Sequence, residues 1–180
     1  MKTSLKLVLT LSLLWCTPLF AFPNAEKFDP NTWLEVGRAR LSVLFFDVYD
    51  SRLKTPSGHY EGYQEPVALE IHYLRDIKGS ALVTQTVKEW DSLGLSPETY
   101  EPYLKPLESL LPDVKKGDSL TFIVLPGGSN TFYYNGQTLG GLDDPTFGQH
   151  FLNIWLSPNT SRPELRAQLL GSDACETLAC

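Results

Sequence analysis

Residues 36–50 read V-G-R-A-R-L-S-V-L-F-F-D-V-Y-D, and this stretch is the first strong structural element along the chain. Its apolar side chains occur at both parities: Leu41, Val43, Phe45 and Tyr49 at odd positions, and Leu44, Phe46 and Val48 at even positions. Successive side chains of a strand point to opposite faces, so this pattern predicts a central strand that is covered on both faces.

Residues 67–75 alternate more regularly. Val67, Leu69, Ile71 and Tyr73 share one parity, and the other parity carries Glu70 and His72. This pattern predicts a strand with one core face and one wetter face.

Helical patterns and further strands follow. Apolar residues at helical spacing predict a helix over 79–93, and Ser96-Pro97-Glu98 predicts the start of another, which Pro102 and Pro106 are expected to kink or split. Strands are expected at 120–125, 131–134 and 137–139. Helices are expected from Asp144-Pro145 and from a capping box at 161–164. The order of strands, helices, strands and helices predicts an α+β fold, with a layer of helices on an antiparallel sheet.

The N-terminal 21 residues have the organisation of a secretory signal peptide. Lys2 and Lys6 precede an apolar run at 7–15, Pro18 follows, and Ala21 offers a small residue at the expected cleavage point. A membrane-spanning helix needs about 20 apolar residues, so removal is favoured over stable membrane insertion. We therefore expect a signal peptide at 1–21, a linker at 22–35, one domain at 36–171 and a tail at 172–180. The protein is expected to be exported, to the periplasm in a Gram-negative bacterium.

The charge of the chain argues against nucleic acid as a partner. The whole chain carries 15 basic and 21 acidic residues, and loss of Lys2 and Lys6 leaves 13 basic residues, a formal charge of −8. The remaining lysines are scattered among acids, whereas a nucleic-acid-binding domain concentrates them on one face.

Cysteines and motifs restrict the chemistry further. Cys175 and Cys180 remain after signal cleavage, and an oxidising compartment favours a disulfide between them. The three histidines show no zinc-motif spacing, so no metal is expected. The hydrolase elbow G-x-S-x-G, the Walker loop and the dinucleotide fingerprint G-x-G-x-x-G are absent from the sequence, and no cofactor is expected.

Arg38 and Arg40 are the residues most in need of an explanation. They precede the apolar centre of the 36–50 segment, and an arginine that enters a buried sheet face needs an anion. That anion is either a nearby acid such as Asp47 or Asp50, or the carboxylate or phenolate of a ligand.

Five segments, taken together, resemble a known family. They are G-R-A-R-L-S-V-L-F-F-D-V-Y-D (37–50), L-E-I-H-Y-L-R-D-I (69–77), P-D-V-K-K-G-D (112–118), F-Y-Y-N-G-Q-T-L-G (132–140) and F-L-N-I-W-L-S-P-N-T-S-R-P-E-L-R (151–166). In order and spacing the set resembles the bacterial exported branch of the chalcone isomerase-like superfamily. The resemblance implies an open-faced antiparallel β-sheet packed against helices, with a ligand cleft between sheet and helices.

The resemblance also shows departures from the catalytic members. Plant enzymes of the superfamily use an arginine, a strand threonine, a helical tyrosine and asparagine, and a late threonine or serine. Leu44 stands at the threonine position. If Tyr100 or Tyr103 is the helical tyrosine, the asparagine position holds Leu107 or Leu110. Without these donors, the enolate-like charge of a cyclising chalcone has little to stabilise it.

Other family positions are retained. The arginine corresponds to Arg38 or Arg40, and Thr160 ends an S-P-N-T segment like the late one, so residual catalysis would fall to Arg40, Tyr49 and Thr160. Some non-catalytic members bind fatty acids through an arginine and a tyrosine, for which Arg40 and Tyr49 are the expected pair. The expected ligand-binding residues are Arg38, Arg40, Leu44, Phe46 and Tyr49.

Three hypotheses follow. The first is a non-catalytic protein that binds a small apolar or amphipathic, fatty-acid-like ligand. The second is an intramolecular lyase that acts on a chalcone-like or other phenolic substrate. The third is a periplasmic protein-interaction subunit, with Tyr60 and Tyr63 available to a protein partner.

Overall fold

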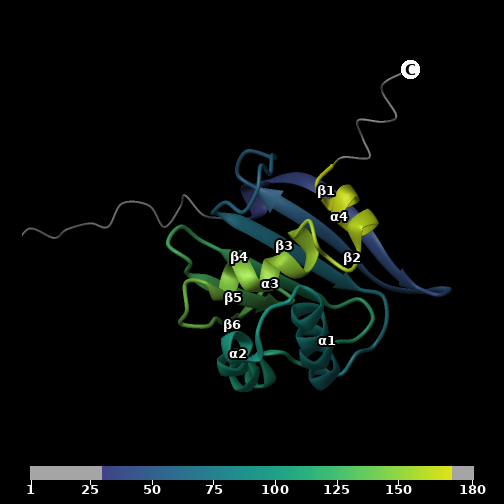
Figure 1. Ribbon diagram of the computed structural model, residues 1–180. Coiled ribbons are helices and arrows are strands. Elements are labelled where there is room, and N and C mark those ends of the chain that lie inside the picture. The colour runs from purple at the N-terminus through teal and green to yellow at the C-terminus, as the bar shows by residue number, and fades with distance from the viewer. Residues whose placement is uncertain (1–29, 172–180) are drawn as a thin grey trace, which may run out of the picture.

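The computed structural model describes residues 30–171, shown in Figure 1. In chain order, their elements are a 3₁₀ turn at Pro30–Thr32, β1 (Leu34–Val43), β2 (Phe46–Thr55), β3 (Val67–Tyr73), α1 (Gly79–Ser92), α2 (Pro97–Leu110), β4 (Ser119–Val124), β5 (Asn130–Tyr134), β6 (Gln137–Gly140), α3 (Phe147–Leu156) and α4 (Pro163–Leu169). The expected signal peptide, tail, Cys175 and Cys180 lie outside the described residues.

The strands form one antiparallel sheet in the order β1-β2-β3-β4-β5-β6. Strand β3 shows why one face of this sheet is covered. Its residues Val67, Leu69, Ile71 and Tyr73 are at most 5% exposed, whereas His72 is exposed. The helices pack on the buried face, so the predicted α+β fold with an open-faced sheet is confirmed (Figure 1).

The prediction of a single central strand at 36–50 was wrong. This stretch forms most of the β1–β2 hairpin, in which Val43 pairs with Phe46 and Leu44-Phe45 make the turn. Leu and Phe carry none of the turn preference of Gly, Asn or Asp, so the sequence pattern gave no sign of a turn. Their apolar side chains are exposed rather than buried between two layers.

Trp90 on α1 packs against the other two helices of this layer that lie beside it, α2 and α3. Its indole stacks on Tyr100 of α2 at 5.6 Å between centroids, packs edge-on against Phe147 of α3, and donates a 2.9 Å hydrogen bond to the His150 carbonyl. One fully buried side chain therefore joins three helices over the sheet.

The opposite face of the sheet is mostly polar. Lys54 and Glu70 form an ion pair at 3.1 Å across β2 and β3. A small separate cluster on this face contains Trp33, Ala68 and Ile123, all at most 6% exposed.

Two helix predictions need correction. Helix α2 runs from Pro97 to Leu110, so Pro102 and Pro106 do not split it. Both prolines lie on its exposed side, where carbonyls that lack a helical partner meet water. Helix α4 has Arg162 at its N-cap without a side-chain cap, because the Ser161 hydroxyl donates to Glu89 instead of forming a capping box.

Within residues 30–171, no helix combines the length and apolar content that crossing a bilayer requires.

Trp90→Ala is expected to lower the free energy of unfolding by about 3–5 kcal/mol, because it empties a dry site shared by three helices. Urea denaturation followed by circular dichroism measures the change. Trp33→Ala is the matched control, since this tryptophan belongs to the small cluster on the other face. An equal or larger loss at Trp33 would contradict this account of the helix layer.

Candidate ligand-binding site

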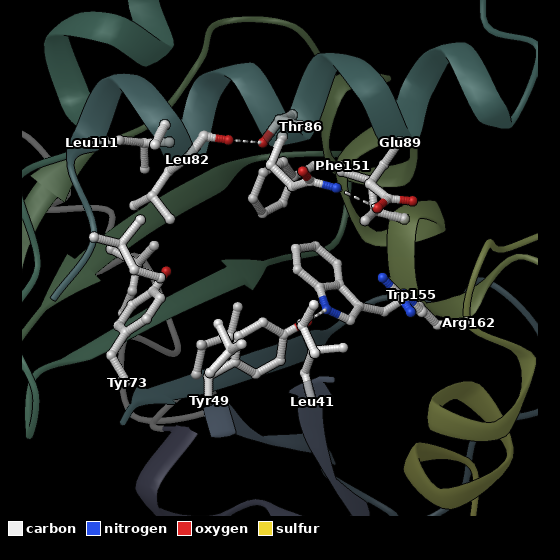
Figure 2. Close-up of a pocket in the computed structure, with 18 residues that line it drawn as sticks. Leu41, Tyr49, Tyr73, Leu82, Thr86, Glu89, Leu111, Phe151, Trp155 and Arg162 are labelled. Atoms are coloured by element: carbon white, nitrogen blue, oxygen red, sulfur yellow. Dashed lines mark hydrogen bonds between the residues drawn. The ribbon is translucent and has the colours of Figure 1, made fainter. Parts of the chain in front are cut away.

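A cavity of about 430 Å³ lies between the helix-covered face of the sheet and helices α1 and α3 (Figure 2). Most of its wall is apolar: Leu41, Val43, Val48, Ile71, Ile77, Ala81, Leu82, Leu111, Leu120, Phe151, Ile154 and Trp155. Polar groups enter from six residues: Tyr49, Tyr73, Gln85, Thr86, Glu89 and Arg162. An apolar chamber of a few hundred Å³ with a few polar groups is typical of a small-molecule site.

A β-bulge in β2 shapes the sheet side of this cavity. Leu41 pairs with Tyr49 while Ser42 pairs with Asp47, so Val48 is an extra residue without a partner. A bulge interrupts the alternation of side chains, and both Val48 and Tyr49 consequently line the cavity.

Tyr49 is held by Trp155 from the opposite wall. The Trp155 indole donates a 2.8 Å hydrogen bond to the Tyr49 hydroxyl, which leaves the proton of that hydroxyl for another acceptor (Figure 2). Burial raises the pKa of Tyr49 to about 12, with a smaller increase from Glu89, while the Trp155 hydrogen bond and Arg162 act in the opposite direction. Tyr49 is therefore a neutral donor at physiological pH.

Tyr73 supplies a second hydroxyl. Its side chain is 3% exposed, its ring packs edge-on against Tyr49 at 6.3 Å, and its hydroxyl has no hydrogen-bond partner within residues 30–171. Burial also raises the pKa of Tyr73. Since this side chain lines the cavity, a water or ligand atom inside the cavity can accept the Tyr73 hydrogen bond.

Arg162 and Glu89 bring charge to the other side of the cavity (Figure 2). The Glu89 carboxylate accepts hydrogen bonds from Gln85 at 2.7 Å and from the Ser161 hydroxyl at 2.6 Å. Among residues 30–171, no carboxylate lies within 4.0 Å of the Arg162 guanidinium. A cation beside an apolar wall without an ion-pair partner is suited to an anionic ligand group.

The arginines singled out in the sequence do not line this cavity, although Arg40 borders an adjoining hollow that Arg162 also lines. Arg38 forms an ion pair with Glu35 at 2.7 Å, and Arg40 pairs with Asp50 at 2.6 Å and with Asp47 at 3.1 Å. Neither lines the cavity. Hydrogen bonding to Arg40 lowers the pKa of Asp50, as expected for a local ion pair. The anions are therefore residues of the chain, which was one of the two alternatives left open.

The other expected site residues are also separated from one another. Leu44 and Phe46 are exposed at the hairpin tip, whereas Tyr49 lines the cavity. Arg40 and Tyr49 are not brought together, because Arg40 lies opposite Asp50 and extends to its carboxylate. Thr160 is buried and donates to the Ile154 carbonyl at 2.6 Å, outside the cavity wall.

The tyrosines considered for other roles have structural partners. Tyr100 donates to Asp91 and Tyr103 donates to Asp144, and neither lines the cavity. Tyr60 and Tyr63 are partly buried against the main core, so their rings are not fully available to a protein partner.

Sequence reasoning missed Tyr73 and Arg162 as cavity residues. Tyr73 shares the parity of the core residues of β3, which made it look like ordinary core. Arg162 follows the S-P-N-T segment by two residues, and this proximity to a recognised segment was the one available signal.

No group of three or more His, Cys, Asp or Glu side chains within 30–171 is arranged to hold a metal ion. The cavity offers two tyrosine hydroxyls, the Glu89 carboxylate, one arginine and an apolar wall. This combination of polar and apolar groups is suited to an amphipathic molecule.

The fold and cavity define a class of protein: an open-faced antiparallel sheet with helices on one face and an apolar chamber between the two layers. Residues 38–171 match the family model described as chalcone isomerase-like, so the chain belongs to the chalcone isomerase-like family. The resemblance seen in the sequence is thereby confirmed at the level of the family.

Two proteins, one found by sequence and one by structure, are similar to this chain. An uncharacterized protein of Haemophilus influenzae is 32% identical over 139 residues, which is 77% of this chain and 68% of that protein. The crystal structure of a fatty-acid binding protein from Arabidopsis thaliana superposes with a TM-score of 0.60 at 12% identity, over 82% of this chain and 92% of that one. At this identity the second likeness shows a shared fold.

Tyr49 is expected to ionise about two units above an ordinary tyrosine, whose pKa is 10.0. Because the unfolded chain loses this proton first, the free energy of unfolding falls as the pH rises from 10 to 12. In a tyrosinate absorbance titration, Tyr49→Phe should remove a group that ionises near pH 12. Trp155→Phe should move that group higher still, since the donated hydrogen bond favours tyrosinate. Loss of a group that ionises near pH 10 in Tyr49→Phe would contradict the buried environment.

Proposed function

We propose that this protein is a non-catalytic carrier that binds a fatty-acid-like ligand in the cavity, with its carboxylate at Arg162. The observation that carries the proposal is the position of Arg162, which has no ion-pair partner among the described residues and stands at the edge of an apolar chamber. An acyl chain matches the apolar wall, and a carboxylate matches the forked guanidinium.

Tyr49 adds to the head-group site. Burial raises the pKa of Tyr49 and the charge of Arg162 opposes this rise, so Arg162 and Tyr49 act on the same region of the cavity. Since Trp155 already donates to its oxygen, the Tyr49 hydroxyl is oriented to donate its own proton to a ligand oxygen. An arginine and a tyrosine thus remain the binding pair, with Arg162 in the role first expected of Arg40.

Glu89 modulates the same region. Its charge raises the pKa of Tyr49, and it therefore opposes an anion bound nearby. Both of its oxygens are held by hydrogen bonds from Gln85 and Ser161, which keep its negative charge in a fixed position beside the head-group site. Glu89 is expected to moderate affinity, which suits a carrier that must release its ligand.

Two features support binding without catalysis. The position of the catalytic threonine in plant relatives holds Leu44, which is 85% exposed and outside the cavity. Tyr100 and Tyr103, the candidates for the catalytic tyrosine, are engaged by acids elsewhere. A fatty-acid binding protein of Arabidopsis thaliana shares the fold, which supports the ligand class.

Export to the periplasm belongs to the same proposal. The signal-like segment at 1–21 supports it. In that compartment the ligand would be a lipid-like acid met near a membrane.

Arg162→Met is expected to weaken binding of palmitate by about 10–100-fold, since a hydrogen bond to a charged group contributes about 1.5–3 kcal/mol. Displacement of a fluorescent fatty acid measures the change. Binding of hexadecanol, which has the same chain without the charge, should change less than threefold. Arg38→Met is the matched control, because Arg38 is an exposed arginine of the same domain that pairs with Glu35 and lines neither the cavity nor the hollow that adjoins Arg162.

Equal weakening by Arg38→Met and Arg162→Met would contradict this head-group assignment. Glu89→Gln should tighten palmitate binding, and an unchanged affinity would show that Glu89 does not oppose the bound anion.

Incubation with naringenin chalcone separates binding from catalysis. Cyclisation faster than in buffer, with one enantiomer of the product in excess, would contradict the carrier function and show that the protein is an intramolecular lyase.

A further inference from the structure

The tip of the β1–β2 hairpin is the most exposed apolar surface within residues 30–171. Val43, Leu44, Phe45 and Phe46 are 42%, 85%, 96% and 64% exposed. They are consecutive, and the hairpin carries them beyond the helix layer (Figure 1). Scattered exposed apolar residues are ordinary, but four in a row at a protruding tip indicate an interaction site.

The turn chemistry supports a functional reason for these residues. Leu44 has a φ of 58°, in the left-handed region where a Cβ atom is unfavourable. Asn-Gly would make a two-residue hairpin turn with less strain and greater solubility. Departures from local sequence preference of this kind are expected at functional sites.

The form of the tip favours a lipid bilayer as the occupant. The tip is a convex wedge at the end of a two-stranded hairpin, and a fluid bilayer accepts such a wedge without a preformed complementary pocket. Just behind the tip the side chains become polar. The Ser42 hydroxyl donates a hydrogen bond to the Asp47 carboxylate at 2.6 Å, and this carboxylate also accepts a hydrogen bond from Arg40. An apolar end followed by a polar collar matches the change from acyl chains to head groups at a membrane interface.

The charges near the tip indicate which kind of lipid bilayer it suits. Arg40, a cation close behind the tip, is paired with both Asp47 and Asp50. The chain as a whole has a formal charge of −6. Attraction to anionic lipid is therefore not the source of binding, and a zwitterionic surface is suited to this tip.

The tip is continuous with the cavity wall. Val43 belongs to the exposed tip and also lines the cavity, and Leu41 and Val48 line it from the adjoining part of the hairpin. An acyl chain that moves between a bilayer and the cavity along this hairpin stays in contact with apolar side chains.

We propose that the hairpin tip at 43–46 inserts into the surface of a zwitterionic lipid bilayer and brings the cavity wall at Val43 close to that surface. The docking part of the proposal depends on the exposed apolar residues of the tip and on the polar residues just behind them. The passage of a ligand from the bilayer to the cavity also depends on the proposed function.

The test replaces the tip with a favourable turn. Leu44→Asn combined with Phe45→Gly creates Asn-Gly, which preserves the hairpin and removes the two most exposed apolar side chains. Co-sedimentation with phosphatidylcholine vesicles should show at least tenfold weaker binding for this variant than for the wild type. Leu34→Asn is the control, since Leu34 is 57% exposed at the opposite end of β1 and should bind as the wild type does.

The details of binding provide further checks. Wild-type binding should vary less than threefold between 50 and 500 mM salt and should not increase with phosphatidylglycerol. Phe45→Trp should show a blue-shifted difference fluorescence with phosphatidylcholine vesicles, and brominated lipid should quench it. Equal vesicle binding by wild type and the Asn-Gly variant would overturn the proposal, as would a wild type that self-associates through the tip and ignores vesicles.

A separate measurement isolates the passage step. Palmitate affinity in solution should be the same for the Asn-Gly variant, while its rate of transfer to acceptor vesicles should fall at least fivefold. Vesicle binding without palmitate binding would refute the proposed function and leave docking intact, whereas the reverse result would refute docking alone.

Discussion

The hydrogen bond from the Trp155 indole to the Tyr49 hydroxyl joins α3 to β2 across 106 positions of the chain. It links the two layers at the wall of the cavity, where other side chains of the sheet and of the helices are separated. The rest of the helix layer is closed by aromatic packing around Trp90 and Phe147. The domain therefore has a densely packed aromatic region around Trp90 and Phe147 and, beside it, a cavity whose two walls are joined by this hydrogen bond.

The same sheet edge determines both the shape of the cavity and the shape of the surface. The bulge at Val48 turns two consecutive side chains of β2 toward the cavity. Beyond the bulge, the two strands leave the helix layer and carry apolar residues into solvent. One hairpin thus supplies both the exposed tip and part of the cavity wall, and the proposed coupling of ligand binding to a lipid surface rests on this continuity.

Much of the architecture could be predicted from the sequence. The alternation in β3 identified its core face, and the helix over α1 followed from apolar spacing, because both patterns reflect burial on one side. The β1–β2 hairpin could not be predicted, since its turn lacks Gly, Asn and Asp and its exposed apolar residues resemble a buried strand.

The candidate site was predicted less well than the fold. Tyr49 was identified, but Arg162 was not, because the cation and the tyrosine come from segments that meet only in the folded chain. Arg40 stood close to Tyr49 in sequence, yet its neighbouring acids satisfy it.

The central claim is that the cavity holds a carboxylate beside Arg162. Carboxyl ¹³C NMR of palmitate labelled at its carboxyl carbon, titrated over pH in the presence of the protein, tests it most directly. The account predicts a separate bound resonance whose pKa lies below that of free palmitate, because a cation and a hydroxyl donor stabilise the charged form. A bound resonance with a raised pKa, or no bound resonance at all, would contradict it.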